Sequence, residues 1–147
     1  MYLNLKNPLA FFDLETTGTN ISQDRIVEIA IIKLMPNGEK LVKDLRINPL
    51  IPIPPEVTKI HGISDDDVKD APPFKQVARE LAKFLEGSDF AGFNIIRFDV
   101  PLLVEEAHSR LVHCREPVLR FASCLLEEGQ GVIVLLVHQK PKGILVL

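Results

Sequence analysis

The sequence is poor in cysteine and in long apolar runs. Its 147 residues include two cysteines, Cys114 and Cys124, which are too few for a disulfide framework and favour a reducing compartment. No stretch reaches the roughly 18 apolar residues of a membrane span, and no apolar run follows Lys6 as it would in a signal peptide. These absences predict a protein without a membrane segment, located by default in the cytoplasm.

An excess of positive charge is also missing. The net charge is −3 and the pI is about 5.8, so the chain as a whole does not attract a phosphate backbone. Any contact with nucleic acid would have to be local, through bound cations or a small basic patch. With 46% hydrophobic and 25% charged residues, the composition predicts a single globular domain over residues 1–147.

Prolines, glycines and capping residues divide the first hundred residues into predicted elements. Asn37 and Gly38 are typical of a hairpin turn with positive φ angles. Four prolines within residues 48–56 exclude regular structure there. Ser64 precedes a run of acids that favours a helix start, and these acids receive no other role: Asp65, Asp66 and Asp67.

The periodicity of apolar residues supplies the rest of the pattern. We expect strands at 9–14, 25–35, 39–47 and 90–93, and helices or helical turns at 57–63, 73–87 and 98–107. This order predicts an α/β domain with a mixed sheet whose first three strands form an antiparallel meander. His61 falls at the end of a predicted helical turn, where by itself it fits a loop histidine or a helix cap as well as a pocket residue.

Two carboxylates meet at the end of the first predicted strand. Asp13 and Glu15 flank Leu14, and alternate residues of a strand point to the same face. Carboxylates about 6–7 Å apart repel each other unless a cation lies between them, and Mg²⁺ suits such oxygen ligands. A bare Asp-x-Glu pair is often only an acidic strand end in water, but the full string at residues 12–18 is far more specific.

A second group of polar side chains follows the strand predicted at 90–93. Asp99 lies at the start of the next helix, where an aspartate alone is usually a cap. Because that strand is expected at the centre of the sheet, Asp99 could meet Asp13 and Glu15 there. Asn94 and Arg97 add an amide and a cation suited to a phosphate.

Three strings together resemble a known family. They are F-D-L-E-T-T-G at 12–18, I-H-G-I at 60–63 and G-F-N-x-x-x-F-D at 92–99. This combination resembles the DEDDh 3′–5′ exonucleases, a group that includes the proofreading epsilon subunit of bacterial DNA polymerase III. The resemblance covers residues 8–106 and implies a ribonuclease H-like fold, which agrees with the order of elements read above.

The resemblance implies a metal-dependent enzyme that hydrolyses phosphodiester bonds at nucleic-acid 3′ ends, with two Mg²⁺ or Mn²⁺ ions as cofactors. It implies that Asp13 bridges both ions, that Glu15 holds one, and that Asp99 helps to hold the other. The implied partner is nucleic acid, in the first place the 3′ end of single-stranded DNA, with a DNA polymerase subunit as a second candidate. The residues implied to line the nucleotide pocket are Thr16, Thr17, Gly18, His61 and Asn94.

One part of the family pattern is missing. The third motif is a histidine followed five positions later by an aspartate, which act as general base and metal ligand. No aspartate follows Asp99, so none of His108, His113 and His138 is part of such a motif. Both cysteines and three of the four histidines lie after Asp99. Residues 1–106 therefore match the family, and residues 107–147 form a divergent or aberrant segment.

Two explanations fit the missing motif: a tail altered by a shifted reading frame or truncated gene, or replacement of both groups by residues such as His108, Glu127 or Glu128. The first is favoured because two different groups would need replacing. We therefore predict an exonuclease-type domain whose activity is absent or strongly reduced. The alternative is an inactive nuclease-like module that binds 3′ ends or a partner protein. A zinc site is disfavoured because the spacing of its candidate ligands does not match the usual pairs: His108, His113, Cys114 and Cys124.

Overall fold

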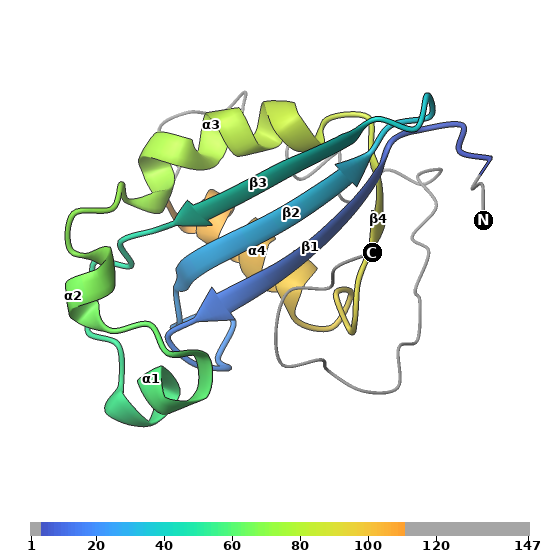
Figure 1. Cartoon of the computed structure of the whole chain (residues 1–147). Coiled ribbons are helices and arrows are strands. Elements are labelled where there is room, and N and C mark those ends of the chain that lie inside the picture. The colour runs from blue at the N-terminus through green and yellow to red at the C-terminus, as the bar shows by residue number, and fades with distance from the viewer. Residues whose placement is uncertain (1–3, 111–147) are drawn as a thin grey trace.

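The structure is a computed structural model that describes residues 4–110. In this range the chain forms a four-stranded sheet of order β3-β2-β1-β4, with α3 and α4 packed on one face (Figure 1). The predictions that concern His113, the two cysteines, Glu127 and Glu128 lie outside the described residues. The elements are β1 (Leu9–Thr16), β2 (Ile26–Leu34), β3 (Lys40–Arg46), α1 (Pro55–His61), α2 (Asp65–Val68), α3 (Phe74–Leu85), β4 (Asp89–Ala91) and α4 (Asp99–Arg110).

The sheet is mixed, as the sequence predicted. β1 pairs with β2 and β2 with β3 in antiparallel register, whereas β4 runs parallel to β1. The antiparallel meander confirms the predicted fold class. The expectation that the strand at 90–93 lies at the centre of the sheet is wrong for the described residues, because β4 lies at the edge, beside β1. No helix within residues 4–110 is long and apolar enough to cross a membrane.

Side-chain alternation along β1 sorts residues between the two faces of the sheet. Phe12 and Leu14 are buried under α3 and α4, and the ring of Phe12 meets that of Phe90 edge-on at 5.8 Å. The intervening residues Asp13 and Glu15 project to the opposite face. The apolar core therefore anchors the strand that carries both acids.

The predicted hairpin is present, but its turn differs in type. Gly38 has a positive φ of 88°, whereas the φ of Asn37 is not positive. The amide of Gly38 donates to the Met35 carbonyl at 2.9 Å, and Met35 donates to the Glu39 carbonyl at 2.8 Å. A three-residue loop needs one left-handed position, and glycine provides it without a steric penalty.

The proline-rich segment ends earlier than predicted. α1 begins at Pro55, within the range from which regular structure had been excluded. Proline is tolerated at the first helical position because its missing N–H would have no intrahelical partner there. Gly62, with φ 80°, ends α1 in the left-handed region, directly after His61.

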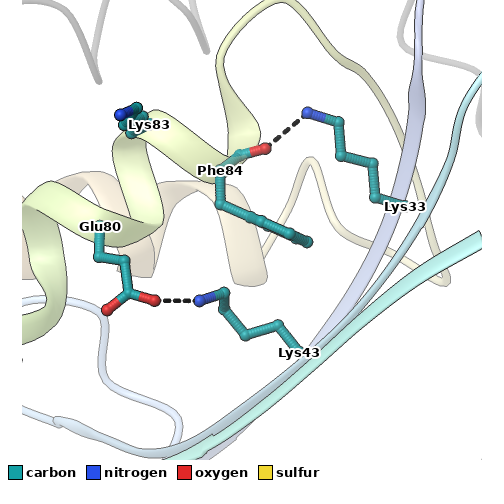
Figure 2. Close-up of a pocket in the computed structure, with 5 residues that line it drawn as sticks. All are labelled: Lys33, Lys43, Glu80, Lys83 and Phe84. Carbon is teal, nitrogen blue, oxygen red and sulfur yellow. Dashed lines mark hydrogen bonds and ion pairs between the residues drawn. The ribbon is translucent and has the colours of Figure 1, made fainter.

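A cluster of lysines surrounds the carboxyl end of α3 (Figure 2). Lys33 is 8% exposed, and its ammonium donates to the Phe84 carbonyl at 2.6 Å. Lys43 pairs with Glu80 and lies 5.1 Å from the centre of the Phe84 ring. Because the carbonyl end of a helix is negative, these cations stabilise it. These contacts account for the positions of Lys33 and Lys43, which line a groove of about 310 Å³ at this place.

Candidate active site

The two carboxylates of β1 differ in their surroundings. Asp13 is exposed and lies opposite Ala30 in the register of β1 and β2. Glu15 is half-buried and lies opposite Glu28, which is paired with Arg46 at 2.7 Å. The acidic end of the strand is thus partly balanced by one arginine, while Asp13 faces solvent.

Asp99 reaches this strand from the start of α4. Its side chain is 5% exposed, and its Oδ1 accepts a hydrogen bond from the amide of Leu14 at 3.2 Å. Since Leu14 lies between Asp13 and Glu15, this bond seats Asp99 on the backbone that joins them. The structure therefore brings the three predicted carboxylates to one end of the sheet. In residues 4–110, however, no three acidic, histidine or cysteine side chains converge as a ready-made metal cluster.

The loop between β4 and α4 depends on close backbone contact. A Cβ at Gly92 would lie 2.3 Å from the Ile95 side chain and 3.2 Å from the Phe12 carbonyl oxygen, so the position requires glycine. Asn94 has a φ of 56°, a left-handed conformation that asparagine tolerates. The Asn94 carbonyl accepts the amides of Arg97 and Phe98 at 3.0 and 3.3 Å. This compact turn delivers Asp99 to β1.

Thr16 and Thr17 were predicted to bind substrate, and both are buried. The Thr16 hydroxyl donates to the Gly18 carbonyl at 2.6 Å, and the Thr17 hydroxyl donates to Asp24 at 2.8 Å. A Cβ on Gly18 would lie 2.4 Å from the Asp24 carboxylate. The threonine hydroxyls thus shape the turn, and their predicted contact with substrate stays a prediction.

His61 is bonded on both ring nitrogens. Nδ1 accepts the amide of Ile63 at 3.0 Å, so the proton must lie on Nε2, which donates to the Thr16 carbonyl at 3.2 Å. The histidine therefore holds the end of α1 against the end of β1. This geometry places His61 beside the candidate site, and its role in a nucleotide pocket stays a prediction.

Sequence reasoning missed two features of the site. Phe93 and Ile96 are each 51% exposed although they are large and apolar, and both belong to the loop that delivers Asp99. Arg25, in the turn directly before β2, and Glu106, on α4, approach to 3.9 Å while largely buried. Phe93 is an aromatic residue between Gly92 and Asn94, and its position in the sequence was a signal for the exposed apolar surface of this loop. The second could not be read, because nothing local in the sequence links residues so far apart.

Comparisons with known proteins agree with the predicted exonuclease family. The RNase_T family, described as an exonuclease, matches residues 10–123. The chain is 34% identical to a PolC-type DNA polymerase III of Caldanaerobacter subterraneus subsp. tengcongensis over 106 residues, which are 71% of this chain and 7% of that protein. It is 35% identical to the DNA polymerase III subunit epsilon of Treponema pallidum, over 65% of this chain and 44% of the relative. The chain thus spans less than half the length of these relatives.

Solved structures share the fold. Exonuclease I from Methylocaldum szegediense superposes with a TM-score of 0.66 at 23% identity, over 77% of this chain and 25% of that protein. E. coli exonuclease I in complex with a dT13 oligonucleotide gives a TM-score of 0.64 at 19% identity, over 71% and 24%. At this level of identity the likeness concerns the fold alone. The family match and the motifs together establish that the chain belongs to the RNase_T exonuclease family, as its resemblance to the DEDDh 3′–5′ exonucleases predicted.

Proposed function

We propose that this chain is the nuclease region of a metal-dependent 3′–5′ exonuclease, with strongly reduced activity in this form. The observation that carries the proposal is the bond from the Leu14 amide to Asp99, which seats a buried carboxylate on the backbone that joins Asp13 to Glu15. Three carboxylates at one strand end form a hard oxygen donor set that suits Mg²⁺ or Mn²⁺. Side-chain rotations would have to bring them together, because they are not gathered beforehand within the described residues.

The carboxylates Asp13, Glu15 and Asp99 would hold the metal ions. Bound divalent ions would supply charge neutralisation at the scissile phosphate and a more acidic water. Around the ions, side chains of this protein would orient the nucleic-acid strand. The exposed face of Phe93 offers a surface on which a base can stack, a contact that commonly holds single strands without regard to sequence. The exposed Arg97 adds a cation for the phosphate backbone.

The reduced activity follows from what the sequence lacks. No aspartate follows Asp99, so the expected histidine–aspartate motif is absent. His108 lies on α4 and is exposed, nine positions beyond Asp99 in the chain. Loss of a general base typically lowers a rate by about 10²–10⁴-fold, and loss of a metal ligand deepens the effect.

The expected substrate is the 3′ end of single-stranded DNA. Support comes from the fold shared with E. coli exonuclease I in complex with dT13 and from the sequence similarity to DNA polymerase III epsilon of Treponema pallidum. A DNA polymerase subunit is the second proposed partner, by the same similarity. Because the net charge is −3, we expect phosphate to be held locally, by divalent cations and by Arg97.

The test uses the 147-residue chain and a 5′-labelled single-stranded DNA with Mn²⁺, Mg²⁺ or EDTA. We expect slow, EDTA-sensitive shortening from the 3′ end, about 10²–10⁴-fold slower than that by the Treponema pallidum epsilon subunit. Asp13→Ala should abolish it. A rate equal to that of the epsilon subunit would refute the reduced activity, and absence of both shortening and Mn²⁺ binding would refute the exonuclease.

A second candidate function is favoured by the lack of a ready-made metal cluster within residues 4–110. In this alternative the chain is a nuclease-like module that holds 3′ ends without cutting them. It would bind the same oligonucleotide saturably, with equal affinity in Mn²⁺ and EDTA, and would give no metal-dependent products. The two candidates are thus separated by the effect of EDTA on binding and cleavage.

A further inference from the structure

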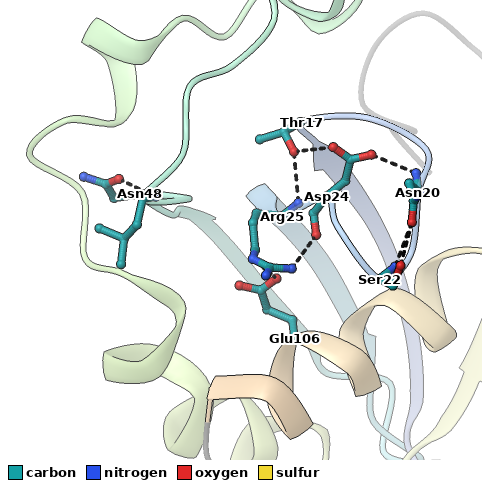
Figure 3. A network of polar contacts seen from close by, with 8 residues as sticks. Thr17, Asn20, Ser22, Asp24, Arg25, Asn48 and Glu106 are labelled. Carbon is teal, nitrogen blue, oxygen red and sulfur yellow. Dashed lines mark hydrogen bonds and ion pairs between the residues drawn. The ribbon is translucent and has the colours of Figure 1, made fainter.

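The turn between β1 and β2 is organised around one carboxylate (Figure 3). Asp24 accepts the Thr17 hydroxyl through Oδ1 and the Asn20 amide through Oδ2, both at 2.8 Å. Thr17 in turn accepts the Arg25 amide at 3.0 Å, and its own amide donates to the Arg25 carbonyl at 2.9 Å. These bonds fix the backbone of Arg25 from both sides.

The guanidinium of Arg25 is held as well. One of its nitrogens donates to the Asp24 carbonyl at 3.0 Å, and its Nε lies 3.9 Å from Glu106 Oε2. The Arg25 side chain is 18% exposed and that of Glu106 is 3% exposed. A buried carboxylate beside a fixed cation is costly to displace, because moving either group leaves an uncompensated charge.

Glu106 and Asp99 lie seven residues apart on α4, which places them on the same face of the helix about 10 Å apart. Asp99 contacts the amide of Leu14 near the end of β1, and Glu106 contacts Arg25 in the turn directly before β2. Between them, Leu102 and Leu103 are fully buried in the core. α4 is therefore attached to the sheet by apolar packing and by one carboxylate near each end of this span.

We propose that Arg25 is a positioning residue that, through Glu106, fixes α4 so that Asp99 stays on the Leu14 amide. Apolar packing alone resists separation of the helix from the sheet, but it resists sliding and rotation less, because such contacts are not directional. The ion pair at Glu106, whose two atoms are 3.9 Å apart and form no hydrogen bond with each other, adds an electrostatic restraint two turns away from Asp99. The inference rests on the proposed function, in which Asp99 holds metal, and it adds a residue from the β1–β2 turn to that site.

Amide hydrogen exchange measures this positioning without any metal. In Arg25→Gln, exchange at the Leu14 amide should accelerate at least tenfold relative to neighbouring amides of β1 and β2. Lys33→Gln is the matched control, because it also removes a largely buried cation, but at the opposite end of the sheet. It should accelerate exchange throughout the sheet without singling out Leu14. Equal acceleration at Leu14 and its neighbours in Arg25→Gln would mean a purely structural role.

Mn²⁺ affinity, measured by calorimetry, links the positioning to the site. Arg25→Gln should weaken binding about tenfold in the wild-type background, within the 10–100-fold range for groups that orient metal ligands. It should change nothing further when Asp99→Asn is already present. The same loss in both backgrounds would overturn the inference. Equal Mn²⁺ affinity in Arg25→Met/Glu106→Leu, which keeps apolar packing, would also overturn it. Absence of binding by the wild type would instead overturn the proposed function, and the inference with it.

Discussion

Two sets of aspartates in this molecule behave differently although the side chain is the same. Asp24, Asp65 and Asp67 each accept hydrogen bonds from neighbouring backbone amides, at 2.8–3.0 Å. Asp13 and Asp99 form the second set. Asp13 is exposed, and within residues 4–110 its carboxylate forms no hydrogen bond or ion pair. Asp99 accepts the amide of Leu14 in β1, which lies far from it in the chain, rather than an amide of its own loop or helix end. The first set completes loops and helix ends, whereas the second lies at the end of β1.

The difference shows that the role of an acidic residue depends on the hydrogen bonds that its carboxylate accepts rather than on its position in a motif. A carboxylate that accepts two or three backbone bonds is already stabilised as an anion and gains little from a cation. A carboxylate without such donors, close to another of the same sign, gains much. Substitutions in the two sets should therefore separate metal binding from folding stability.

The largest effect is expected at Asp13. Asp13→Asn should lower Mn²⁺ affinity by more than about 100-fold, since even groups that only orient ligands contribute 10–100-fold. It should not lower the free energy of unfolding, because the side chain is exposed and lies close to Glu15 and Glu28. Calorimetric titration with Mn²⁺ and urea denaturation measure the two quantities. A stability loss above about 1 kcal/mol would place Asp13 in the structural set.

The next effect concerns Asp24 and has the opposite character. Asp24→Ala removes the acceptor of the Thr17 hydroxyl, and Thr17 is 1% exposed. An unsatisfied buried hydroxyl and a released turn should together cost about 2–3 kcal/mol of unfolding free energy in urea. Asp24→Asn keeps an acceptor and should lose less than half of this. Equal losses in the two variants would show that the charge, rather than the hydrogen bonds, organises the turn.

Much of the fold could be predicted from the sequence alone. Alternating and apolar patterns located the strands of the meander, α3 and α4, because those elements are set by which face is buried. The string at 12–18 singled out Asp13 and Glu15, and β1 carries both on one face of the sheet, as side-chain alternation predicted. Their role as metal ligands stays a prediction. Element boundaries predicted from prolines were less reliable. Proline disrupts the interior of a helix but is accepted at its first position, and Pro55 starts α1 instead of excluding it.

Long-range pairing was beyond the sequence. The contact of Arg25 with Glu106 joins residues eighty-one positions apart, and no spacing rule connects them. The same holds for the amide of Leu14 and Asp99. They meet because β4 pairs in parallel with β1, at the edge of the described sheet rather than at the expected central position. Whether a given threonine hydroxyl faces a ligand or its own loop also depends on such contacts, as Thr17 and Asp24 illustrate.

A smaller effect is expected at Asp65. Its carboxylate accepts the Ile53 amide at 3.0 Å and so ties the proline-rich segment to the start of α2. Asp65→Ala should cost about 1 kcal/mol in urea denaturation, the net value of one such bond. Asp66→Ala is the matched control, because Asp66 is adjacent, exposed and paired only with Lys69 at 3.5 Å in the described chain. The control should stay within about 0.5 kcal/mol of wild type, and an equal loss in both would point to helix charge instead.

The smallest effect is the titration of Asp67. The hydroxyl of Ser64, followed by its amide, holds the pKa of Asp67 below the ordinary value of 3.8 because both donate to the ionised carboxylate. The capping interaction is therefore fully present above pH 3.8 and is lost as the pH falls through the lowered pKa. In an NMR titration the Ser64 amide should report a midpoint below 3.8, and Ser64→Ala should move the carboxyl midpoint of Asp67 upward. A midpoint unchanged by Ser64→Ala would mean that the hydroxyl does not stabilise the anion. The Ser64 amide would then be the donor that keeps Asp67 in the same set as Asp24 and Asp65.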